Sequence, residues 1–220
     1  MLIGEKEMNQ ITKTNFRMDF FKRVKPIKLT DPLAAVLGAV EPGEVFYYHY
    51  TDLVKMSGHS CPAVSGAFKM TEAALSELYE NEIPVRGNIR VTIKGAEDHG
   101  ANGPISQVIS LISGAANDMG FKGLQGRFNR YKLLAFDAEH PPAKELTAEA
   151  EFERVDTGRK VTIQYNSSLI PGNPEMMQLM PLVISGQASE DQLHKFGDLW
   201  QGRVERVLLN PPRGVFTIVT

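Results

Sequence analysis

The sequence predicts an α+β fold in which a mixed or antiparallel sheet packs against helices. Three observations indicate this class. Apolar residues after Pro62 recur at three-and-four spacing, which is typical of one face of a helix. Residues 88–94 alternate and are rich in β-branched side chains, as a strand requires. Helical and strand patterns then mix along the chain without the regular strand–helix alternation of a parallel α/β protein.

Length and composition limit the functional classes. A chain of 220 residues, 42% of them hydrophobic, is long enough to bury a core without cross-links. Its net charge of −2 does not favour nucleic acid as a partner. One cysteine excludes an intramolecular disulfide, and no apolar run approaches the ~20 residues that cross a bilayer. Charges interrupt the N-terminal segment, unlike a secretory signal, so we expect a cytoplasmic protein with no membrane partner.

We divide the chain into an N-terminal extension with a short helix, residues 1–44, and an α+β domain, residues 45–220. Thr30-Asp31-Pro32 supplies a helix cap and a first-turn proline for the short helix. The aromatic run at 45–50 fits either a strand or the beginning of a helix, and periodicity does not choose between them.

The elements of the domain follow from local signals. The helix after Pro62 should end near Glu80, before Ile83-Pro84. Pro104 marks a second helix, which follows a glycine-rich loop. Strands are expected at 131–136, 148–155, 160–165 and 215–220, with Gly158 in a tight hairpin between the second and third. A capping box at Ser189 starts a late helix. That helix is expected to bury Leu193, Phe196, Trp200, Val204 and Val207.

The stretch that carries the chemistry is Ser57-Gly58-His59-Ser60-Cys61-Pro62, which contains the only cysteine. Pro62 suits the first position of a helix, so His59 and Cys61 should lie at a helix N-terminus. The helix dipole and unpaired N–H groups there favour an anion such as a thiolate. An imidazole beside a thiolate indicates either a soft metal site or a nucleophile with its base. Cys61 and His59 are therefore the candidate catalytic residues.

A metal at His59 and Cys61 needs a further ligand from elsewhere in the chain. His99 is the strongest candidate because it lies in a loop between a strand and a helix. Asp98 beside it and His49 are further candidates. So small a set predicts a site that keeps an open position for water or substrate. The structural alternatives are that Cys61 is a buried hydrophobe and His99 a turn residue.

One further group of residues is a candidate for an anionic ligand. Arg127, Asn129 and Arg130 lie near glycines. A solvated surface explains the same pattern equally well.

Gly58-His59-Ser60-Cys61-Pro62 and the later Ile105-Ser106-Gln107-Val108-Ile109 resemble motifs of the FmdE-like family, which is named for one component of formylmethanofuran dehydrogenase. The resemblance covers about residues 45–218. It implies an α+β core, often dimeric, with a metal such as zinc held by the matching pair His59 and Cys61. The family's second cysteine has no counterpart here, and His99 or Asp98 occupies that region. An imidazole in place of a thiolate suits zinc or nickel.

From the motif and the resemblance together, we predict a homodimeric metal-binding protein whose open site polarises water or a small substrate. One alternative is a metal-free enzyme in which Cys61 is the nucleophile. The other is a non-catalytic accessory protein of a larger complex, whose metal is structural.

Overall fold

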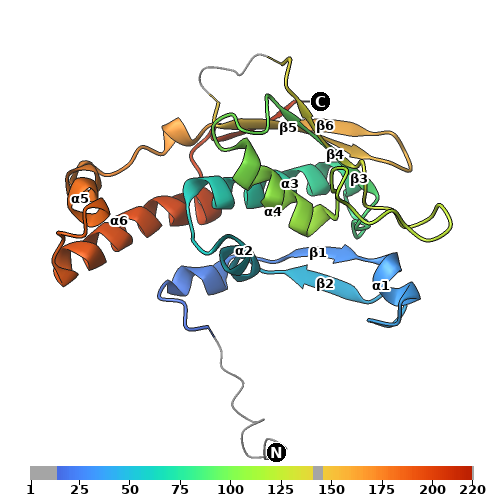
Figure 1. Cartoon of the computed structure of the whole chain (residues 1–220), viewed down its shortest axis with the longest axis horizontal. Coiled ribbons are helices and arrows are strands. Elements are labelled where there is room, and N and C mark those ends of the chain that lie inside the picture. Colours follow the sequence, from blue (N-terminus) through green and yellow to red (C-terminus); the bar gives the residue numbers. More distant parts are fainter. Residues whose placement is uncertain (1–13, 141–145, 220) are drawn as a thin grey trace, which may run out of the picture.

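The computed structural model describes residues 14–140 and 146–219, and it confirms the α+β class (Figure 1). The larger sheet has five strands in the order β4-β3-β5-β6-β7. β3 and β4 run parallel, whereas the other neighbours are antiparallel, so the sheet is mixed. Its strands are β3 (Ile89–Lys94), β4 (Leu134–Asp137), β5 (Ala148–Arg154), β6 (Lys160–Tyr165) and β7 (Phe216–Val219).

Two helices form the middle layer. Figure 1 shows α3 (Pro62–Tyr79) and α4 (Asn102–Ser113) between the large sheet and a smaller antiparallel sheet of β1 (Ile27–Thr30) and β2 (Val45–Tyr48). α3 contacts α4, β6 and α6 (Glu190–Leu209), which explains why most of its residues are buried. The predicted start at Pro62 and the end near Glu80 are both confirmed.

The strand pattern at 88–94 is also confirmed, since β3 buries every second side chain. Gly158 adopts a φ of 70° in the turn between β5 and β6, which a residue without a Cβ adopts most readily. β4 begins at Leu134 rather than at the predicted Tyr131. Lys132 has a φ of 57°, a left-handed conformation that cannot continue a strand, so residues 131–133 belong to the loop.

The described part of the N-terminal segment packs on the core, and residues 1–13 lie outside the described ranges. The 3₁₀ helix η1 (Asp19–Arg23) brings the ring of Phe21 edge-on to Tyr50, with centroids 5.2 Å apart. The expected short helix is α1 (Pro32–Val36). Both alternatives for the aromatic run occur, because β2 ends at Tyr48 and α2 (Tyr50–Ser57) begins after His49.

The C-terminal part contains η2 (Ser167–Leu169), α5 (Pro174–Ile184) and α6. The closing strand predicted over 215–220 is confirmed as β7 over Phe216–Val219, and residue 220 lies outside the described residues. α5 and the first half of α6, residues 174–199, extend away from the sheets in Figure 1, and we call them the arm. The prediction that Leu193 is buried is wrong, since this side chain is 51% exposed; within the arm α6 packs chiefly on α5. Val204 and Val207 are buried as predicted. No helix in the described ranges is long and apolar enough to cross a membrane.

Candidate functional site

Cys61 occupies the N-cap of α3, where the sequence predicts it. Its backbone is extended, with φ −144° and ψ 169°, and Pro62 takes the first helical position. The Val64 N–H donates a hydrogen bond to Sγ of Cys61 over 3.5 Å. A thiol in this position meets the positive end of the helix dipole and backbone N–H groups that the helix leaves without acceptors. The side chain is partly exposed and therefore accessible to a metal or a small reactant.

Ser60, between the two candidate residues, is held from two other helices. Its hydroxyl lies 2.9 Å from the Tyr50 hydroxyl and donates to Oε1 of Gln201 over 3.0 Å. Its carbonyl oxygen accepts from Nε1 of Trp200 and Nε2 of Gln201, at 2.9 and 3.1 Å. Since Tyr50 begins α2 and the other two belong to α6, the backbone joining His59 to Cys61 is fixed on both sides.

His59 is exposed, but its ring is oriented by the backbone. Nδ1 lies 2.8 Å from the carbonyl oxygen of Ser57, and a carbonyl only accepts, so Nδ1 carries the proton when the imidazole is neutral. Nε2 then keeps its lone pair. Metal-binding histidines commonly have this arrangement, with one ring N–H donating to a carbonyl and the other nitrogen left to the metal. The same lone pair equally suits a general base.

Two buried tyrosines support the start of α3. Tyr165 on β6 donates a hydrogen bond from its hydroxyl to the Pro62 carbonyl over 2.9 Å. Burial raises the pKa of both Tyr50 and Tyr165, so each hydroxyl stays neutral and can donate. Sequence reasoning missed Tyr165, Trp200 and Gln201, because they lie more than a hundred positions from Cys61 and show no local signal.

The remaining predicted ligands lie in two other segments of the chain. His49 precedes α2, and its backbone N–H donates to the Asp52 carboxylate over 2.9 Å. Asp98 and His99 are exposed in the loop before α4, where His99 and His140 line a small cavity of about 30 Å³. Across the described ranges, no group of three or more His, Cys, Asp or Glu side chains is placed to hold a metal ion. The wider ligand set of His49, Asp98 and His99 therefore stays a prediction.

Asn102 explains the shape of the loop that carries His99. This residue is buried, and its Nδ2 donates to the carbonyl oxygens of Lys94 and Ala96, at 3.2 and 2.8 Å. The amide therefore ties the beginning of α4 to the end of β3. Both hydrogen bonds of the Asn102 side chain therefore stabilise the loop conformation.

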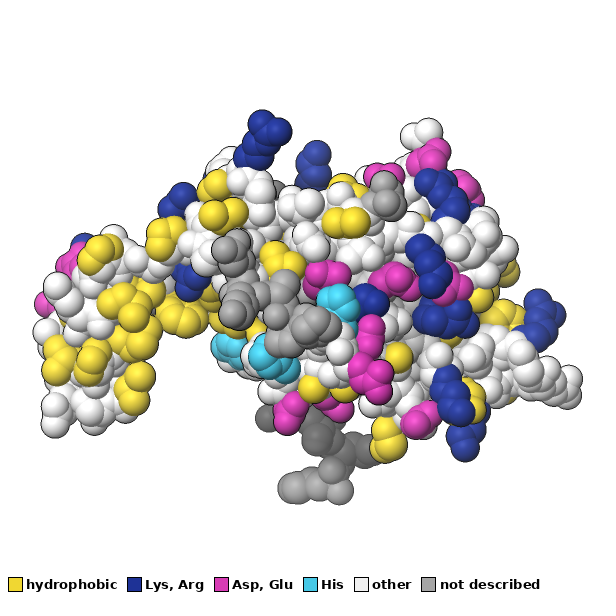
Figure 2. All heavy atoms as spheres, turned by 90° about the horizontal axis from the view of Figure 1, so that it is seen from above, with side chains coloured by type: hydrophobic (Ala, Val, Ile, Leu, Met, Phe, Trp, Pro, Cys, Tyr) yellow, Lys and Arg dark blue, Asp and Glu magenta, His cyan; other side chains and the backbone are white. Residues whose placement is uncertain are grey.

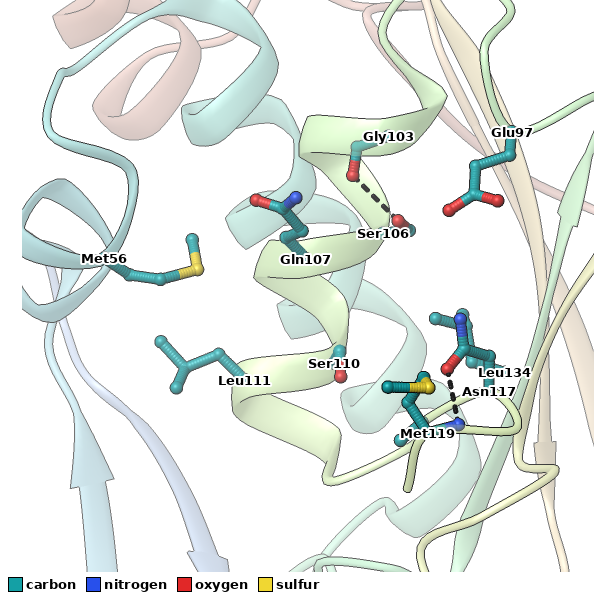
Figure 3. A pocket seen from close by; sticks show the side chains of 11 residues that line it. Met56, Glu97, Gly103, Ser106, Gln107, Ser110, Leu111, Asn117, Met119 and Leu134 are labelled. Atoms are coloured by element: carbon teal, nitrogen blue, oxygen red, sulfur yellow. Dashed lines mark hydrogen bonds between the residues drawn. The ribbon is translucent and has the colours of Figure 1, made fainter.

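A larger cavity of about 500 Å³ lies beside α4, and segments next to both predicted loops line it (Figure 3). Met56 directly precedes the Ser57–Pro62 stretch, and Glu97 and Gly103 lie on either side of His99. In Figure 3 Met56 and Leu111 lie on one side of α4, and Glu97 lies on the other. The lining combines amides, hydroxyls and apolar groups, and its size suits a small organic molecule. Residues next to both loop-to-helix junctions therefore line the same cavity.

No protein-family model matches the chain, and no curated protein is significantly similar to it. The resemblance to the FmdE-like family rests on the residues of the motifs alone.

Proposed function

We propose that the chain is a cytoplasmic metal-binding protein of the FmdE-like type, with an open site at His59 and Cys61. The observation that carries the proposal is the orientation of this pair. His59 has Nδ1 on the Ser57 carbonyl, which leaves Nε2 free, and Cys61 presents sulfur at the N-cap of α3. One nitrogen and one sulfur donor suit a divalent transition metal, zinc or nickel.

The donor set fits an open site. Two protein donors leave the other coordination positions of a tetrahedral ion to water, to a substrate or to a ligand such as His99. Such an ion, when bound, polarises a water molecule or a carbonyl oxygen. The residues of this chain then hold the donors in place, because the backbone at Ser60 is fixed by Trp200 and Gln201. The cavity beside α4 provides room for a small substrate near the same loops.

Two alternatives use the same residues. In a metal-free enzyme, Cys61 is the nucleophile and Nε2 of His59 accepts its proton. In an accessory protein of a larger complex, the metal at His59 and Cys61 is structural and no substrate binds.

Metal content tests the proposal. Protein purified without chelator should carry about one zinc or nickel ion per chain, and the Cys61→Ser and His59→Ala variants should lose it, since each removes one of two adjacent donors. Elemental analysis measures the content. Trp200, the only tryptophan, donates to Ser60 inside the site, so its fluorescence should change when metal is restored.

His194→Ala is the matched control, because His194 is exposed on α6 and its loss should leave metal content unchanged. His99→Ala tests the wider ligand set. Near-zero occupancy in all variants and in the wild type would contradict a metal site. Rapid alkylation of Cys61 well below pH 8 in that metal-free protein would then favour the nucleophile. Metal that only raises the melting temperature, with no small molecule binding, would favour the accessory protein.

We also propose that the protein is a homodimer and that the arm contributes to its interface. Figure 2 shows apolar side chains gathered over the end of the molecule formed by α5 and α6. Met177, Ile184 and Leu193 in the arm are 55%, 79% and 51% exposed. Exposed apolar surface of this kind, projecting from the body, is characteristic of association sites. A second copy is the partner that the sequence resemblance favours.

Ile184→Glu should therefore convert a dimer into a monomer, because it places a charge in the apolar surface. Light scattering coupled to size exclusion measures the mass. Leu37→Glu is the control, since Leu37 is 61% exposed near α1, outside the arm. A monomeric wild-type protein, or a dimer that survives in the Ile184 variant, would contradict the proposed interface.

A further inference from the structure

Arg86 and Arg130 lie side by side around one carboxylate at the junction of the two sheets. Arg130 is only 7% exposed, and its Nη2 donates to Oδ1 of Asp31 over 2.5 Å. Nη1 of Arg86 donates to Oδ2 of the same carboxylate over 3.1 Å. Two guanidinium groups therefore share a single negative charge. Burial lowers the pKa of Arg130, and the neighbouring Arg86 acts in the same direction, as expected for a cation in a site with excess positive charge.

The two arginines also keep donors without acceptors. Within the described residues, Nε of Arg86 and Nε of Arg130 are buried and have no hydrogen-bond partner. Native proteins rarely bury such donors unpaired, so the hydrogen-bonding capacity of the two guanidinium groups is not fully used by the protein. The other hydrogen bonds of the pair go to backbone carbonyl groups, namely those of Leu111 for Arg86 and of Arg86 for Arg130.

A cavity of about 160 Å³ adjoins these side chains. Its polar lining consists of both arginines with Asn88 and Asn129, and no carboxylate of the described residues lines it. The volume is several times the ~30 Å³ share of one water molecule, which leaves room for a small polyatomic anion. Gly87 makes the packing feasible, since a Cβ at this position would lie 1.1 Å from Nη1 of Arg130. Arg130 is thus part of a preformed pocket, and the sequence-based alternative of a solvated surface is wrong for this residue.

We propose that this pocket, which we call the Arg86–Arg130 pocket, binds a small oxyanion of the size of phosphate. Guanidinium groups present planar, fixed donors that match the oxygen atoms of phosphate or carboxylate. Nδ2 of Asn129 donates one N–H to the Tyr131 carbonyl over 3.2 Å and keeps a second N–H, and neither Asn129 nor Asn88 adds negative charge to the lining. The anion would balance the second arginine at the place where Thr30, at the end of β1, bonds to Pro84 and Arg86 ahead of β3. Binding would therefore strengthen the junction between the two sheets.

Titration calorimetry of the full chain with inorganic phosphate tests this site, with ionic strength kept constant by sodium chloride. We expect saturable binding of one phosphate per chain and a rise in melting temperature. Acetate in a parallel arm shows whether a carboxylate serves as well. Asn129→Asp should weaken phosphate binding at least about tenfold, because it places a negative charge in the lining. Asn210→Asp, at the exposed end of α6, is the control and should bind normally.

The Cys61→Ser variant separates this site from the proposed metal site, since phosphate also binds metal ions. Phosphate binding that persists in Cys61→Ser and weakens in Asn129→Asp supports the Arg86–Arg130 pocket. Binding that disappears in Cys61→Ser, equal binding in the Asn129 and Asn210 variants, or an absence of saturable binding would each overturn it.

Discussion

Replacing Asp31 with asparagine should lower the free energy of unfolding by about 3–5 kcal/mol, the usual cost of removing one partner of a buried ion pair. The carboxylate accepts from both Arg86 and Arg130, and its side chain is only 7% exposed. Its loss leaves two buried guanidinium groups without a counter-charge. Oδ1 of Asp31 accepts from the Leu33 N–H in the cap of α1, and asparagine can keep this hydrogen bond. The variant therefore measures the effect of the lost charge separately from the loss of the cap. Urea denaturation measures the difference.

Asp198→Asn provides the matched control. Asp198 forms an ion pair with Arg17 at 2.8 Å, but both side chains are well exposed. Surface pairs of this kind contribute at most about 1 kcal/mol. If the Asp31 and Asp198 variants lost similar stability, the buried charge cluster would not hold the two sheets together as described.

A methyl group at position 66 should be strongly destabilising. The Cβ of alanine at Gly66 would lie 2.2 Å from Cε1 of the Tyr165 ring, far inside van der Waals contact. Tyr165 is fully buried, stacks on Phe216 and donates to the Pro62 carbonyl, so it has little freedom to move away. We expect Gly66→Ala to cost about 1–3 kcal/mol or more of unfolding free energy, as overpacking of a core does.

Gly202→Ala, in α6, is the opposite case, because nothing lies within 4 Å of its added Cβ. Alanine is the better helix former, so this variant should gain about 0.5–1 kcal/mol. Thermal and urea unfolding of both variants give the comparison. A neutral Gly66→Ala would mean that α3 and β6 are not packed as closely at this point as the structure has them.

Much of the fold could be predicted because local rules govern it. Pro62 fixes the start of α3, the alternation of residues 88–94 defines β3, and Gly158 permits the turn of the hairpin. These signals need only neighbouring residues. They do not determine which other elements pack on a helix face. Leu193 therefore has the expected helical position in α6, but its side chain is exposed in the arm.

The candidate site likewise has a part that local sequence predicts and a part that depends on distant residues. Proline geometry and a two-residue spacing are enough to predict that His59 and Cys61 lie together at a helix N-terminus. The groups that surround the pair come from distant parts of the chain and follow from the folded arrangement. Trp200 reaches Ser60 from 140 positions away, and Asn102 ties the His99 loop to the end of β3.

The same division applies to the Arg86–Arg130 pocket. In the sequence, only the nearby glycines indicate a possible anion site at Arg130. Its burial and its ion pair with a carboxylate 99 positions earlier result from the fold. Local sequence sets backbone dihedrals and periodicity. Long-range packing decides which side chains lose water and which charges meet, and these two effects give the side chains of this protein their chemistry.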